Sequence, residues 1–126
     1  MDDVHGYDFA HRDGTVFDPA DGEEHDTQVA GIIAARWNNG EGVAGIAPGA
    51  RIMVLKAFGG ETTTESAVEA IAYAERVGAR IVNMSWGGEE DDAALKDAIA
   101  QSDMLFVAGA TPTRGPTTPL PMIWAT

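Results

Sequence analysis

The stretch His25-Asp26-Thr27-Gln28-Val29-Ala30-Gly31-Ile32-Ile33-Ala34-Ala35 carries the signal that decides the fold of this chain. Its branched apolar residues, Val29, Ile32 and Ile33, recur at helical spacing. The alanines and the glycine between them let another backbone approach closely. An acidic loop, residues 18–24, leads into the histidine. We therefore expect a buried helix whose first residue keeps its imidazole ring at the surface, where a general base must lie.

Further along the chain, strand patterns alternate with helix patterns. Residues 3–10 alternate loosely, which is typical of a short edge strand. Continuous apolar runs of strand length follow at residues 51–57, 80–84 and 104–108, and helix patterns separate them. This alternation favours parallel pairing, because a helix returns the chain to the same edge of the sheet. We predict an α/β fold, a three-layer sandwich with a mostly parallel sheet.

The ends of the two later helices have recognisable signals. Thr62-Thr63-Thr64-Glu65 has the form of a capping box, and Gly78 suits the end of the helix that it opens. Acidic residues 89–92 precede the next helix, where negative charge favours the positive end of the helix dipole. These signals predict a helix from about residue 62 to Gly78 and a second helix after residue 92, with Ala94, Leu95, Ala98 and Ile99 as its apolar stripe.

The composition changes after Gly109. Four of the six prolines lie between residues 110 and 121, and such a stretch supports neither a helix nor a central strand. Met122-Ile123-Trp124 is its only apolar anchor, suited to dock on this chain or on a neighbour. We therefore divide the chain into a partial α/β core, residues 3–109, and a Pro/Thr-rich extended C-terminal tail, residues 110–126.

Length and charge limit the possible functions. A chain of 126 residues has room for one domain at most. Eight basic and twenty acidic residues give a net charge of −12, which disfavours nucleic acid and anionic membranes as partners. We expect neither a membrane span nor a signal peptide, since no apolar run reaches about 18 residues and the first residues lack a basic and apolar leader. The chain has no cysteine, and its compartment stays open.

Four motifs in order resemble those of the subtilisin-like serine peptidases, the subtilases. Residues 25–31 are similar to the family's His-Gly-Thr-His-Val-Ala-Gly motif, with Asp26 and Gln28 in place of the glycine and the second histidine. Residues 42–48 resemble the loop that follows, and residues 51–57 the next strand. Ile81-Val82-Asn83-Met84-Ser85-Trp86-Gly87-Gly88 resembles the substrate-binding segment. The resemblance covers residues 3–109.

The resemblance implies a catalytic base at His25, but the sequence lacks the family's motifs for the other three catalytic groups. The family's orienting aspartate lies upstream in an Asp-Thr/Ser-Gly motif, and no such motif occurs here. The nucleophile's Gly-Thr-Ser-Met-Ala pattern is also absent, and Ala110 follows Gly109 where the family has its oxyanion asparagine. Because acyl transfer needs a nucleophile, base, orienting group and oxyanion donor, we expect a fragment of a serine peptidase that is inactive alone, a pseudoenzyme.

The resemblance also implies two binding sites. Two glycine-containing segments would flank an extended peptide or protein segment by strand pairing; the implied substrate-binding residues are Gly59, Gly60, Ser85, Trp86 and Gly87. The turn after the first helix resembles the family's calcium loop, since its oxygen ligands suit a hard cation. The implied Ca²⁺ ligands are the Asn39 side chain and the carbonyls of Trp37, Glu41 and Val43. The acidic residues of 18–26 are interpreted as a solvated loop.

In the resembled fold, the absent upstream strand lies between the strands at 51–57 and 80–84. Unpaired interior edges are costly and recruit other chains, so we expect these two strands to pair directly or another copy to fill the gap, in a homodimer or strand-swapped oligomer. Two alternatives remain open. One is a hydrolase of simple esters that uses His25 with nearby carboxylates at an oligomer interface, and the other is a peptide-binding or association module. His5 and His11 are interpreted as surface residues.

Overall fold

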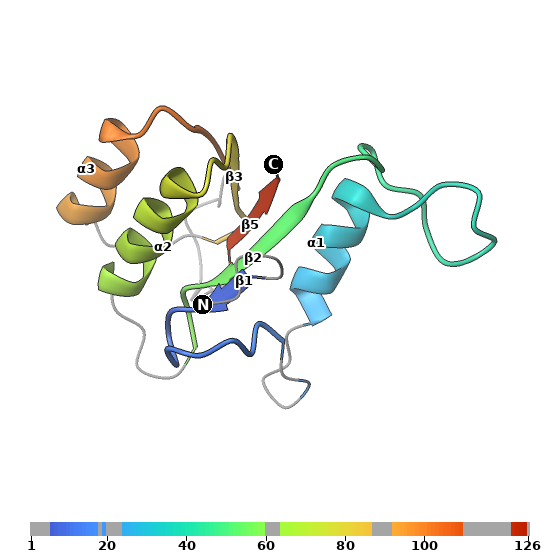
Figure 1. The fold of residues 1–126 in the computed structure, drawn as a ribbon, viewed down its shortest axis with the longest axis horizontal. Coiled ribbons are helices and arrows are strands. Elements are labelled where there is room, and N and C mark those ends of the chain that lie inside the picture. Colours follow the sequence, from blue (N-terminus) through green and yellow to red (C-terminus); the bar gives the residue numbers. More distant parts are fainter. Residues whose placement is uncertain are drawn as a thin grey trace.

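A computed structural model describes residues 6–17, 19, 24–59, 64–86 and 92–109, together with the backbone of 122–125. The elements, in order, are β1 (Gly6–Asp8), α1 (Glu24–Ala34), β2 (Ile52–Lys56), α2 (Thr64–Arg76), β3 (Ile81–Met84), α3 (Ala93–Gln101), β4 (Leu105–Ala108) and β5 (Met122–Ala125). Figure 1 shows three layers, with α2 and α3 on one face of the sheet and α1 on the other. The predicted α/β class and layering are confirmed.

The sheet has five strands in the order β1-β2-β5-β3-β4. β1 pairs in parallel with β2, as expected for a short edge strand, and β3 pairs in parallel with β4. β5 lies between β2 and β3 and runs antiparallel to both. It pairs Met122 with Leu55 on one side and with Met84 on the other.

The prediction that β2 and β3 pair directly is wrong, since the chain's own Met122–Ala125 segment lies between them. The homodimer or strand-swapped oligomer stays a prediction. The physical reason is that a strand between them satisfies the backbone groups of both edges at once. β4 ends and β5 begins opposite the same residue, Met84, so the chain re-enters the sheet from the edge at which it left and must run in reverse.

The hydrophobic core lies between the sheet and the α2–α3 layer. Alternate residues of β2 and β3 point into it, and Leu55 and Val82 are fully buried. α2 supplies small residues that let the helix lie close to the strands, and larger side chains fill the remaining space. The buried residues of α2 are Ser66, Ala67, Ala70, Ile71, Tyr73 and Ala74. Met104 and the partly buried Leu95, Ala98 and Ile99 extend the core beneath α3.

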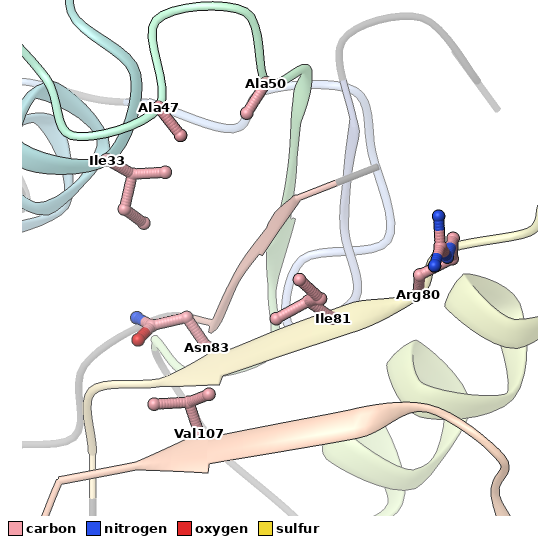
Figure 2. A pocket seen from close by; sticks show the side chains of 7 residues that line it. All are labelled: Ile33, Ala47, Ala50, Arg80, Ile81, Asn83 and Val107. Atoms are coloured by element: carbon pink, nitrogen blue, oxygen red, sulfur yellow. The ribbon is translucent and has the colours of Figure 1, made fainter.

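Among the described residues, α1 is the one helix on the opposite face of the sheet, and the prediction of a buried helix there is wrong. No residue of α1 is buried, and Ile32 is 58% exposed. A cavity of about 410 Å³ opens between the helix and the strands. Figure 2 shows Ile33, Ala47 and Ala50 on one side of it and Ile81, Asn83 and Val107 on the other, with Arg80 at one end. One helix does not cover the width of this sheet face.

The small residues of α1 do accept a neighbouring backbone, as predicted. A Cβ atom added to Gly45 would lie 2.4 Å from the backbone nitrogen of Ala35 and 2.7 Å from that of Ala34. The same segment caps the helix, because Gly45 N donates to Ala35 O at 3.0 Å and Ile46 N donates to Ile32 O at 2.9 Å. Glycine at position 45 is therefore required by the close approach of two backbones.

Two of the predicted helix ends are confirmed. Gly78 has φ +86° and follows α2, where Ala79 N donates to Ala74 O at 2.9 Å. Asp92 is the N-cap of α3 and accepts from Leu95 N at 3.0 Å. The predicted capping box at 62–65 falls largely outside the described residues, but α2 begins at Thr64 and its hydroxyl donates to Asp92.

The Asp92 carboxyl group links α2 to α3. The hydrogen bond from the Thr64 hydroxyl, followed by that from the backbone of Leu95, holds the pKa of Asp92 below its ordinary value of 3.8. A charged cap at this end of α3 also favours the helix dipole. None of the helices in the described ranges has the length and apolar character that crossing a membrane requires.

Candidate active site

His25 lies in the first turn of α1, and its side chain is 40% exposed. Its Nδ1 atom is 3.4 Å from Oδ1 of Asp26, whose side chain is mostly buried. This distance is at the long end for a hydrogen bond, so Asp26 holds the ring only weakly. Figure 1 shows α1 beginning toward the same edge of the molecule at which β2 ends. The imidazole is thus partly exposed to solvent at the start of α1.

The three serines of the chain all have partners other than His25. Ser66 is buried on α2 and donates to the Phe9 carbonyl at 3.3 Å. Ser102 donates to Glu75 Oε1 at 3.2 Å, and Ser85 accepts from Asn83 Nδ2 at 2.8 Å. The Ser66 hydroxyl thus lies in a contact between α2 and the residue after β1, and the Ser102 hydroxyl in a contact between the end of α3 and α2. The Ser85 hydroxyl lies at the end of β3.

The segments expected to bind a peptide follow β2 and β3. Phe58 and Trp86 lie just after these strands, and their ring centroids are 4.5 Å apart at an interplanar angle of 60°. The two strand ends therefore meet through an aromatic contact, with Ser85 and Gly59 beside it in the sequence. Gly59 has φ +141°, a conformation that favours glycine. Gly60 and Gly87, which the resemblance also implied, lie outside the described residues.

A charged group beneath Gly59 was missed by sequence reasoning. The carboxylate of Asp8 is buried and accepts from both His11 N at 2.8 Å and His11 Nδ1 at 2.9 Å. The ammonium group of Lys56, also buried, lies 3.5 Å from the same carboxylate. A Cβ on Gly59 would lie 3.1 Å from Lys56 Cε and 3.2 Å from His11 Cε1. The group therefore supports Gly59 from below, and His11 is exposed, as expected of a surface residue, while its ring also contacts Asp8.

Local sequence gives little signal for this group. Lys56 ends an apolar strand run and Asp8 lies in an alternating segment, so each separately suggests a solvated strand end. Parallel pairing of β1 with β2 places Asp8 opposite Lys56. Burying one charge is costly unless the opposite charge is buried beside it. Whether the two side chains meet depends on the register of two strands far apart in the sequence.

Trp86 has an unsatisfied polar atom. Its Nε1 is buried and has no hydrogen-bond partner within the part of the chain that the structure describes. A buried donor without an acceptor costs about 1–3 kcal/mol. Because Trp86 lies at the end of β3, an acceptor brought to this edge by a ligand would remove that cost.

The turn after α1 has the conformation of a tightly curled loop. Asn38, Gly40 and Gly42 all have positive φ, at 55°, 74° and 54°. Within the loop, Asn39 Oδ1 accepts from Glu41 N at 3.1 Å, and Trp37 Nε1 donates to Gly45 O at 2.6 Å. The described residues contain no cluster of three or more histidine or acidic side chains that suits a metal. Any cation here would depend on carbonyl and amide oxygens.

Comparison with known proteins identifies the family of this chain. The sequence profile described as the subtilase family matches residues 2–119, nearly the whole chain. This chain belongs to the subtilase family. The resemblance inferred from the four motifs is confirmed.

Several curated proteins are similar to this chain. The thermophilic serine proteinase of Bacillus sp. (strain AK1) is 40% identical over 98 residues, which cover 76% of this chain and 24% of that protein. Thermitase of Thermoactinomyces vulgaris is 37% identical, over 76% of this chain and 34% of that protein. The major intracellular serine protease of Bacillus subtilis (strain 168) is 39% identical, over 76% and 31%. The chain thus spans about a quarter to a third of these relatives. No solved structure gives a significant match.

Proposed function

We propose that this subtilase chain is part of a subtilisin-like serine peptidase domain that retains the base histidine and one edge of the peptide-binding site, and that it does not cleave peptide bonds by itself. The observation that carries the proposal is the placement of the three serines, each of which has another hydrogen-bond partner than His25. An imidazole without a hydroxyl or thiol beside it has no nucleophile to activate.

A serine-directed reagent tests the missing nucleophile. We expect no covalent adduct with an organofluorophosphate and no hydrolysis of a chromogenic peptide by the purified chain. His25→Ala is the matched control, because it removes the base and should leave both null results unchanged. An adduct on Ser66, Ser85 or Ser102, lost in His25→Ala, would overturn the proposal.

We also propose that the edge formed by Gly59, Ser85 and Trp86, continued by Gly60 and Gly87 in the sequence, binds an extended peptide or protein segment. Three observations support this proposal: the aromatic contact between the ends of β2 and β3, the charged group beneath Gly59, and the unsatisfied indole N–H. A peptide that adds strand pairing here supplies carbonyl groups as hydrogen-bond acceptors.

Two substitutions of Trp86 separate the apolar contact from the hydrogen bond. Trp86→Phe keeps an aromatic ring against Phe58 and removes the N–H, so we expect peptide affinity to fall about five- to tenfold, the value of one hydrogen bond. Trp86→Ala removes both and should abolish measurable binding. Isothermal titration with an extended apolar hexapeptide measures both variants. Equal affinity of all three proteins would exclude this edge as the binding site.

The amide and carbonyl oxygens of the loop after α1 are suitable calcium ligands, since Ca²⁺ binds such oxygens. We propose Asn39 Oδ1 and the carbonyls of Trp37, Glu41 and Val43 as its ligands, with the ion stabilising the loop after α1. Calcium at 100 times its dissociation constant should add about 2.7 kcal/mol to the free energy of unfolding by linkage and so raise the melting temperature. Asn39→Ala should remove that rise. Identical melting with calcium and with a chelator would refute the site.

The comparisons give no support to ester hydrolysis as an alternative, because the relatives described above are named as proteinases or proteases or as thermitase. The same His25→Ala control, assayed with p-nitrophenyl acetate, separates the two functions. Esterase activity that depends on His25 would restore the alternative.

A further inference from the structure

The backbone at Gly59 has a conformation that depends on the side chains beside it. Gly59 follows the last residue of β2 by three positions and has φ +141°, a value that residues with a Cβ atom rarely adopt. A Cβ atom there would lie 3.1 Å from Cε of Lys56 and 3.2 Å from Cε1 of His11. Two side chains therefore pack against this glycine, and their positions limit how far its backbone can move on that side.

Lys56 is held at both ends of its side chain. Its carbonyl oxygen accepts from Phe9 N at 2.7 Å, which fixes the backbone end. Its Nζ atom lies 3.5 Å from Oδ2 of Asp8, and the two side chains are only 3% and 2% exposed. A buried ammonium group is stabilised by an opposite charge beside it, because neither group is then left unpaired. The aliphatic part of Lys56, which lies against Gly59, is thus fixed between the sheet and the Asp8 carboxylate.

His11 is positioned by the same carboxylate. Reciprocal backbone hydrogen bonds close a turn, since Asp8 N donates to Asp13 O at 2.9 Å and Asp13 N donates to Asp8 O at 3.1 Å. Within this turn, His11 N donates to Oδ1 of Asp8 at 2.8 Å, and Nδ1 of the ring lies 2.9 Å from Oδ2. One carboxylate therefore orients both side chains that pack against Gly59.

We propose that Asp8, Lys56 and His11 are positioning residues for peptide binding: the Asp8 carboxylate holds the other two side chains against Gly59 and so fixes the backbone that pairs with an extended peptide. The inference rests on the proposed peptide-binding function of this edge. Strand pairing requires backbone N–H and C=O groups in fixed directions. A backbone that is already held in place loses less conformational freedom on binding, so its affinity for the peptide is higher.

Two variants test the positioning role with the same extended apolar hexapeptide. His11→Ala removes a side chain that is 45% exposed and keeps the buried pair of charges, so the chain should fold normally. We expect its dissociation constant for the peptide to rise about three- to tenfold. Asp8→Asn/Lys56→Met removes both buried charges together and should weaken binding at least as much. Isothermal titration measures the affinity, and NMR of the Gly59 amide reports the change in its surroundings.

Two controls separate positioning from general stability. Arg12→Ala changes the neighbour of His11 in the same turn, but the Arg12 side chain pairs with Glu69 at 3.4 Å, so peptide affinity should not change. Leu55→Ala removes a fully buried side chain of β2 and lowers stability, yet the folded protein should bind the peptide as tightly as the unsubstituted chain. The Gly59 amide signal should shift in neither control.

The possible outcomes distinguish this inference from the function on which it rests. Unchanged affinity in His11→Ala, in a series where Trp86→Ala loses binding, would overturn the positioning role and leave the binding edge intact. An equal loss of affinity in Leu55→Ala would also overturn it, because the group would then act through stability alone. If Trp86→Ala binds as tightly as the unsubstituted chain, the binding edge itself is refuted, and the positioning role with it.

Discussion

The two faces of the sheet are built differently. On one face, α2 and α3 lie against alternate strand residues, and Leu55 is fully buried between them and the sheet. On the other face, α1 is the one helix in the described part of the chain; it has no buried residue and leaves a cavity of about 410 Å³ (Figure 2). Leu105 on β4 is 60% exposed.

One face of the sheet mainly provides stability, and the other carries candidate functional residues. The face covered by α2 and α3 supplies the hydrophobic core, and apolar burial there is the main stabilising contribution. The face covered by α1 carries His25 in its first turn and the candidate calcium loop after its last turn. Substitutions on the two faces should therefore differ in their effect on unfolding even when the chemical change is the same.

The largest expected effect comes from one matched pair of substitutions. Leu55→Ala removes a fully buried side chain and should lower the free energy of unfolding by about 2–5 kcal/mol. Leu105→Ala makes the same change at an exposed position and should alter it by less than about 0.5 kcal/mol. Urea denaturation followed by circular dichroism measures both. Equal losses would show that the two faces contribute alike.

A second substitution tests the contact that fixes α1. Gly45→Ala places a methyl group 2.4 Å from the backbone nitrogen of Ala35, so the loop or the helix must shift. We expect a loss of about 1–3 kcal/mol, the usual cost of overpacking, and faster amide exchange in α1 than in α2. Gly49→Ala is the control, because its added Cβ meets nothing within 4 Å. Unchanged exchange in α1 would contradict the close approach at Gly45.

The cavity on the α1 face offers a gain in stability. Ala50 lines it, and Ala50→Leu places apolar atoms in the open space. We expect an increase of about 0.5–2 kcal/mol in the free energy of unfolding, as is common for cavity-filling substitutions. Ala70→Leu on the buried side of α2 makes the same change where no space is left and should destabilise the protein. A gain at both positions would mean that the two faces are packed equally loosely.

The smallest expected effect concerns the α2–α3 contact at low pH. The pKa of Asp92 is below 3.8 in the folded chain, so its charge stabilises the fold above that value, and this contribution is lost as the pH falls through the folded pKa. Thr64→Val removes the first cause of the shift and should raise the pKa of Asp92, moving the acid-induced loss to higher pH. Carboxyl NMR titration measures it, and a titration identical to that of the unsubstituted chain would exclude the Thr64 bond.

The sequence by itself determined the alternation of strands and helices, the end of α2 at Gly78 and the acidic residues that precede α3. It also determined the family, through motifs that include His25. These features depend on residue spacing over one or two turns of helix or one strand, so local patterns contain them.

Only the tertiary structure decided three other features. β5 fills the gap between β2 and β3, α1 stays half-exposed, and the buried pair Asp8 and Lys56 lies beneath Gly59 with the exposed His11 beside it. Each depends on which distant segments meet. A strand's partner is set by the backbone groups left unpaired elsewhere, and a helix's burial is set by how much of a sheet face its neighbours cover.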